Sequence, residues 1–146
     1  MEFESKADRA SIKLVIDKDM ENFFKKNPTT WQKARERTVE AMGRVWADQS
    51  KQITRDDHHI DTGAYINSIG YPTSYVGPNG QEVGRIIHDS QSEGNKSSIK
   101  MGSGVVYAQY LEKRYNIFAR GLDAALDDMA TVGYNYLKQF VTGGAR

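Results

Sequence analysis

Apolar residues recur at steps of three and four in two long stretches of the chain, and each stretch predicts an amphipathic helix. The first runs from residue 29 to about 54 and the second from about 118 to 140. Thr29 and Gln32 have the spacing of a capping box, which favours a helix start at Thr29. The expected buried stripes are Trp31, Ala34, Thr38, Ala41, Met42, Val45, Gln49 and Ile53 in the first helix, and Phe118, Leu122, Ala125, Leu126, Met129, Val132, Gly133, Tyr136, Leu137 and Phe140 in the second.

Shorter apolar runs predict strands. Residues 12–16 and 99–101 are expected to be strands, while 68–76 and 82–88 are expected to pair as a hairpin around the turn at 77–80. The polar stretch 89–98 has no periodicity and predicts a mobile loop, and residues 1–11 and 143–146 are expected to be flexible. The pattern therefore indicates one α+β domain over residues 1–146, in which a small, mostly antiparallel β-sheet packs against two long α-helices.

Composition narrows the class of protein. Twenty basic and nineteen acidic residues leave a net charge of +1, which disfavours a domain that works by gripping nucleic acid. The absence of cysteine excludes disulfides and thiolate metal sites. The N-terminal stretch is no secretory signal, and no apolar run is long enough to span a membrane. We therefore expect a protein that is made in the cytoplasm and has no membrane partner.

The segment Asp61-Thr62-Gly63 matches the active-site triplet of dimeric, retropepsin-like aspartic proteases, in which two such loops share one proton. Its context differs, because that loop should follow an apolar strand in a nearly all-β chain. The simpler interpretation is a turn in which Asp61 accepts backbone N–H groups and Gly63 adopts a positive φ.

The other polar clusters offer no convincing catalytic, cofactor or metal site. His58 and His59 are adjacent and would point apart, so one ion would rarely take both. The basic residues at 25, 26, 35, 37 and 44 interleave with acidic ones, which is typical of a solvated helix face. Two interpretations remain open for the aromatic residues Tyr107, Tyr110, Tyr115 and Phe118: they form a contact surface, or they cover the sheet.

Two segments together resemble a known family. The first, DTGAYINSI (61–69), carries Thr62, Gly63, Ser68 and Ile69; the second, VVYAQYLE (105–112), is followed by a helix that begins NIFARGLDAAL (116–126). The matching positions of the second segment and the helix are Val105, Tyr107, Ala108, Tyr110, Leu111, Glu112, Phe118 and Leu122. The chain is similar here to the tail-completion or neck proteins of long-tailed bacteriophages, the head–tail joining group. It departs from them in Tyr65 with Ile66 and in the link 113–116.

The resemblance implies a structural virion protein that is not an enzyme. It implies rings, commonly hexamers, that join the tail tube protein to the head connector or stopper protein while DNA passes through the channel. It does not separate a tail terminator from an adjacent neck ring. The tyrosines 107, 110 and 115 are candidate interface residues, as is the polar loop, which we expect to become ordered on contact. The loop residues concerned are Ser90, Gln91, Ser92, Glu93, Gly94 and Asn95.

Overall fold

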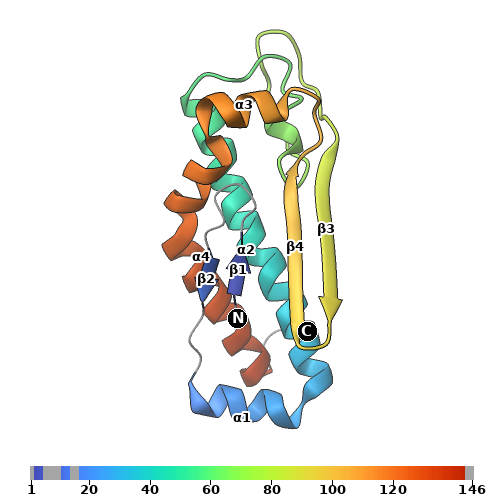
Figure 1. The fold of residues 1–146 in the computed structure, drawn as a ribbon, viewed down its shortest axis with the longest axis vertical. Coiled ribbons are helices and arrows are strands. Elements are labelled where there is room, and N and C mark those ends of the chain that lie inside the picture. Colours follow the sequence, from blue (N-terminus) through green and yellow to red (C-terminus); the bar gives the residue numbers. More distant parts are fainter. Residues whose placement is uncertain (1, 5–10, 14–16, 144–146) are drawn as a thin grey trace.

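The computed structural model describes residues 2–4, 11–13 and 17–143. These residues form the predicted single-domain α+β arrangement, with four α-helices and two antiparallel strand pairs (Figure 1). In chain order the elements are β1 (Glu2–Glu4), β2 (Ser11–Lys13), α1 (Lys18–Lys26), α2 (Pro28–Asp56), the 3-10 turn η1 (Ile66–Ser68), β3 (Ile86–Glu93), β4 (Lys96–Ser103), α3 (Ala108–Tyr115) and α4 (Ile117–Thr142).

The two long helices predicted from periodicity are present and pack along each other (Figure 1). The buried side of α4 follows the prediction at Leu122, Met129 and Leu137. The buried side of α2 is wider than the predicted stripe, because α4 lies against one side of this helix and β4 against another. Ala34, Thr38 and Met42 are buried as expected, whereas Ala41, Val45, Gln49 and Ile53 are only partly buried. The missed buried positions are Arg35, Val39, Gly43, Trp46, Ala47, Ser50, Lys51 and Thr54.

The predicted capping box at Thr29 is wrong. Helix α2 starts at Pro28, with Asn27 as the N-cap residue and no side-chain hydrogen bond at the cap. A proline suits the first helical position because the N–H that it lacks has no partner within the helix there. The side-chain amide of Asn27 instead donates to the Phe23 carbonyl at the end of α1, 2.8 Å away, so the α1–α2 link is a tight corner.

The strand predicted at 99–101 is confirmed as part of β4, but its partner strand lies later in the chain than predicted. Residues 68–76 and 82–88 do not pair as a hairpin; β3 and β4 do, from Ile86 opposite Ser103 to Glu93 opposite Lys96. The expected turn at 77–80 exists as an isolated bridge between Gly77 and Gly80. The mobile loop predicted at 89–98 is therefore wrong as well, since these residues form most of the hairpin and its turn.

A buried arginine explains why this polar stretch is ordered. Arg35 of α2 is 4% exposed, and its guanidinium donates to the Gly94 carbonyl at 2.9 Å and to the Ser97 hydroxyl at 3.2 Å. Ile99 and Met101 on the same face of β4 pack against the core. Arg35 therefore does not belong to a solvated basic face, and it holds the tip of the hairpin on α2.

The chain ends differ from the expectation where they are described. Glu2–Glu4 pairs antiparallel with Ser11–Lys13, so this part of the N-terminal segment is a strand pair and not a frayed arm. The predicted strand 12–16 is described at Ile12 and Lys13 alone, and residues 14–16 lie outside the described part. Gly143 ends α4 in the left-handed conformation, with φ of +78°, and residues 144–146 lie outside the described residues.

Lys51 gives the fold a measurable pH dependence. This lysine is 1% exposed, and its ammonium donates to the Tyr71 carbonyl at 2.6 Å and to the Thr73 hydroxyl at 3.0 Å. Burial lowers its pKa to about 8, with Asp48 opposing and Arg44 adding to the effect. The unfolded chain therefore binds this proton more tightly than the folded chain between pH 8 and about 10.5.

We expect the free energy of unfolding to rise by about 1–2 kcal/mol between pH 7 and 9.5, because the folded amine loses its proton first. Urea titrations across this range should show the rise in the wild type and in Lys33→Met, which changes an exposed lysine of α2, but not in Lys51→Met. The range stops at pH 9.5 because burial raises the pKa of Tyr71 to about 12, and that group opposes the trend above pH 10. Parallel pH profiles for the wild type and Lys51→Met would contradict the assignment.

Candidate functional site

The two segments that carry the family resemblance meet at one end of the molecule. Ser68 of the first segment shares a 2.6 Å hydrogen bond with Ser103, which ends β4 just before the second segment. The rings of Tyr65 and Tyr107 lie 6.4 Å apart, and Phe118 stacks on Tyr65 at 6.1 Å. We call residues 61–69 and 105–112 together the junction.

Most of the matched residues hold the junction together from inside. Ile69 and Leu122 are fully buried, and Ala108 is 6% exposed. Glu112 accepts the backbone N–H of Phe118 at 2.5 and 3.2 Å, which satisfies a free donor in the first turn of α4. Side chains that are buried or that bond the backbone in this way stabilise the fold. The remaining matched residues that are partly or fully buried are Thr62, Gly63, Ser68, Val105, Leu111 and Phe118.

Two matched tyrosines stay on the surface. Tyr107 is 43% exposed and Tyr110 is 59% exposed, beside Val106 at 96%. This exposure favours the contact-surface interpretation for Tyr107 and Tyr110. Tyr115 is partly buried with its ring 4.0 Å from that of His59, and Phe118 packs on Trp46 at 5.0 Å, so these two rings cover the interior.

The candidate interface residues form two groups at opposite ends of the molecule. Helix α3, with the tyrosines, lies at one end, whereas the turn between β3 and β4 lies at the other, near the start of α2 (Figure 1). Ser90, Gln91, Ser92, Glu93, Gly94 and Asn95 are all exposed there. The structure therefore does not bring the two groups into one surface.

The Asp61-Thr62-Gly63 segment is a turn. Gly63 has φ of +88°, as the turn interpretation predicts. Asp61 differs in detail, because its carboxylate accepts from the side-chain amide of Asn79 and its carbonyl accepts the Asn79 N–H at 3.1 Å. The turn follows helix α2, and two helices of 29 and 26 residues dominate the fold. Neither feature suits the all-β scaffold that the protease interpretation requires.

Asn67 organises the loop beside the junction, and its role was missed in the sequence. Its amide is fully buried and donates to the carbonyls of Tyr75 and Glu82, each at 2.9 Å. Its carbonyl oxygen accepts from the Tyr75 N–H at 2.7 Å and from the Thr73 hydroxyl at 3.0 Å. One side chain thus replaces the strand pairing that was expected in residues 68–88. The available signal was an asparagine in a short polar pair, Asn67-Ser68, enclosed by Ile66 and Ile69.

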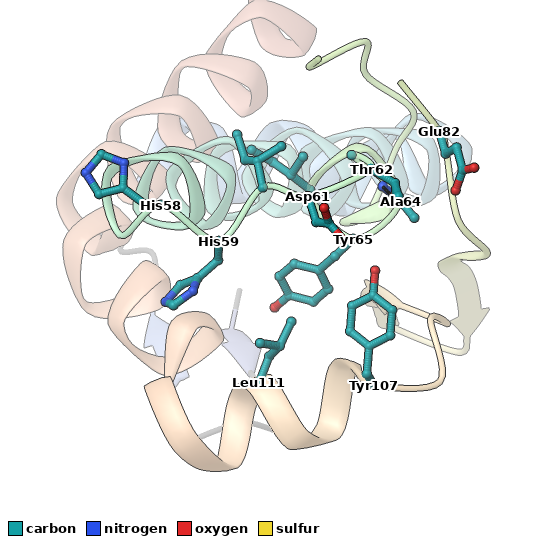
Figure 2. Close-up of a pocket in the computed structure, with 12 residues that line it drawn as sticks. His58, His59, Asp61, Thr62, Ala64, Tyr65, Glu82, Tyr107 and Leu111 are labelled. Atoms are coloured by element: carbon teal, nitrogen blue, oxygen red, sulfur yellow. Dashed lines mark hydrogen bonds between the residues drawn. The ribbon is translucent and has the colours of Figure 1, made fainter. Parts of the chain in front are cut away.

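A hollow of about 500 Å³ opens between the two segments of the junction (Figure 2). Burial raises the pKa of Tyr107, which lies at its rim, and the nearby Asp61 and Glu82 carboxylates raise it further. Burial and the nearby Glu112 likewise raise the pKa of Tyr65. The lining residues are His58, His59, Ile60, Asp61, Thr62, Gly63, Ala64, Tyr65, Ile66, Glu82, Tyr107 and Leu111.

His58 and His59, beside the hollow, directly follow Asp57, the residue that caps the end of α2. Asp57, at the end of α2, forms a 2.7 Å ion pair with Arg120 of α4, and the hydrogen bond from Arg120 lowers the pKa of Asp57. His58 has φ of +60°, which turns the chain away from the helix. Within the described ranges, no three histidine, cysteine, aspartate or glutamate side chains gather as metal ligands.

No helix in the part of the chain that the structure describes is long and apolar enough to cross a membrane. Comparisons with protein-family models, with curated proteins and with solved structures give no significant match.

Proposed function

We propose that this chain is a structural virion protein of a tailed bacteriophage, a tail-completion or neck protein that forms a ring between the tail tube and the head connector. In this role the chain carries out no catalysis, and DNA passes through the ring as cargo. The proposal covers both a tail terminator and an adjacent neck ring, because each is a non-catalytic ring through which DNA passes.

The observation that carries the proposal is the convergence of the two resembling segments. Residues 61–69 and 105–112 are separated by the whole loop and hairpin, yet the rings of Tyr65 and Tyr107 lie 6.4 Å apart, and Tyr65 also stacks on Phe118 of the matched helix. Their contact supports treating the two matches as parts of one structural unit.

The distribution of exposed groups also suits a subunit that joins other proteins. One end carries Tyr107, Tyr110 and Val106 on the surface, and tyrosine is enriched in surfaces that contact other proteins. The other end carries the polar hairpin tip. A ring subunit that joins a tail tube to a head connector needs contact surfaces at separate places, and its neighbours in the ring add more.

Ring formation is the test. We expect negative-stain electron microscopy and native mass spectrometry of the purified full chain to show closed rings at micromolar concentration. Tyr110→Ser should shift the population toward monomers, because tyrosine rings at interfaces contribute much of the contact energy. Tyr136→Ser, which changes a 37% exposed ring on α4, is the matched control and should leave the rings intact. A protein that stays monomeric at every concentration and does not bind tail tubes would refute the proposal.

A further inference from the structure

The hollow at the junction holds two carboxylates without a basic partner. Within the described residues, no lysine, arginine or histidine nitrogen lies within 4.0 Å of Asp61 or Glu82. Both side chains are exposed, and both act on the same hydroxyl, that of Tyr107. Figure 2 shows the Tyr107 hydroxyl directed toward the Asp61–Ala64 stretch, with the two histidines on the side of the hollow away from Glu82. The Glu82 side of the hollow is therefore anionic.

A second feature of the hollow is a hydroxyl that lacks a partner. Tyr65 is 2% exposed, and its hydroxyl makes no hydrogen bond although it is buried. Its ring projects into the hollow between His59, Leu111 and Tyr107 (Figure 2). Buried hydroxyls almost always have partners, so the Tyr65 hydroxyl is a polar group of the hollow that the fold leaves unsatisfied.

The surroundings of the hollow are apolar and exposed. Val106, next to Tyr107, is 96% exposed, and Val83, next to Glu82, is 50% exposed. Gly84 and Val105, their neighbours in the chain, are in close contact, so both valines lie at this end of the molecule. A free small cation would bind the carboxylates and make no contact with the exposed valines. An anionic hollow beside exposed apolar side chains suits a cationic side chain that arrives on a polypeptide with apolar neighbours.

We propose that the hollow binds an arginine side chain of another protein chain, with the guanidinium between the carboxylates of Asp61 and Glu82 and against the ring of Tyr107. Guanidinium fits better than ammonium because its planar, forked donors can bond two carboxylates while its face lies on an aromatic ring. The apolar residues that flank the arginine in the partner rest on Val83 and Val106. This inference does not depend on the ring proposal.

The test is a titration of the full chain at pH 7.5, followed by amide and side-chain NMR shifts. The probes are N-acetyl-arginine amide, the lysine analogue, the neutral isostere N-acetyl-citrulline amide, and the peptide acetyl-Val-Arg-Val-amide. We expect saturable shifts at Ala64, Tyr107 and Leu111 with the arginine probe, weaker ones with lysine and none with citrulline. The valine-flanked peptide should bind at least about threefold more tightly than the single residue, and Val106→Ser should remove that gain.

Variants locate the site. Glu82→Gln and Asp61→Asn should each raise Kd for the arginine probe about threefold or more, the range for exposed ion pairs, whereas Glu36→Gln on the outer face of α2 should not. Glu82→Gln and Asp61→Asn leave the backbone hydrogen bonds beside the hollow in place, and an unchanged amide spectrum outside the hollow confirms that both variants fold. Equal binding of citrulline, equal binding of lysine, or insensitivity to both variants would overturn the guanidinium site. Equal affinity of the peptide and the single residue would overturn a polypeptide ligand, and the absence of any saturable shift would overturn the proposal as a whole.

Discussion

Gly121→Val is expected to lower the free energy of unfolding by about 3 kcal/mol, because position 121 has no room for a side chain. Gly121 lies where α4 meets α2, and a Cβ atom there would overlap the Ser50 hydroxyl oxygen and stand 3.2 Å from the Ser50 Cα. A hydroxyl can rotate, but the helix backbone cannot move away without opening the largest interface of the fold. Urea unfolding followed by far-UV circular dichroism measures the loss.

Gly43→Val is the matched control, since Gly43 also lies inside a long helix and also faces a packed neighbour. A Cβ there would meet the end of Met101, 2.8 Å from Sδ and 3.0 Å from Cε, and a methionine side chain can adopt another rotamer. We expect less than half of the loss seen at position 121. Equal losses at the two glycines would mean that helix propensity, and not the close contact with Ser50, sets the cost.

A double-mutant cycle tests the same contact from the other side. The Ser50 hydroxyl is buried without a hydrogen-bond partner, so its removal exposes no broken bond. In a Gly121→Ala background, Ser50→Gly should recover stability, with a coupling of about 1 kcal/mol or more between the two positions. Additive effects would show that the two helices do not meet at this pair of residues.

Periodicity predicted the long helices because their stability comes from apolar faces that repeat along the chain. The boundary at Thr29 failed because Asn27 and Pro28 form the helix start without the capping box. The buried face of α2 was predicted too narrow because Arg35 and Lys51 read as surface residues in any hydropathy pattern. Each is buried with polar partners from the loop or the hairpin, and those partners are far away in the sequence.

The hairpin was misplaced for a related reason. The face of β3 and β4 that lies on α2 contains serines and a histidine beside Ile99 and Met101, so the alternation that marks a half-buried strand is weak. Ser97 and Gly94 find their partners on Arg35, and His88 finds the Gly70 carbonyl at 2.8 Å. Order in such a stretch depends on contacts that a single sequence does not show.

The junction was predicted in part. The resemblance pointed to both segments, and the structure brings them together. It did not point to Glu82, because this residue reaches the hollow through the irregular loop 71–85. The Glu82 N–H donates to the Thr62 carbonyl at 2.7 Å, and the Gly84 N–H donates to the Ala64 carbonyl at 3.0 Å. Loop-to-turn bonds of this kind follow no periodicity, and the same loop is also bonded by the side chain of Asn67.

Asn67→Asp should therefore release the loop 71–85 and lower the free energy of unfolding by about 3 kcal/mol. Asparagine donates two hydrogen bonds here, to the carbonyls of Tyr75 and Glu82, and an ionised carboxylate can donate neither. The substitution keeps the volume of the side chain, so the loss comes from two buried carbonyls that face a buried negative charge. Hydrogen exchange read by mass spectrometry should show a larger increase in exchange rate over the wild type in residues 71–85 than in α2 or α4.

Asn135→Asp makes the same chemical change on the exposed side of α4 and should leave both stability and exchange close to wild type. Exchange at individual amides separates two explanations of what holds the loop 71–85 in place. If Asn67 holds it, exchange accelerates at the Tyr75 amide, which donates to the Asn67 carbonyl oxygen, and at the Glu82 and Gly84 amides, which bond the turn at 61–64. If backbone bonds alone held the loop, the variant would lose stability uniformly, without selective exchange at these amides. Because Glu82 and Val83 are carried on the same loop, the first outcome also predicts that Asn67→Asp weakens any ligand of the hollow while the helices stay folded.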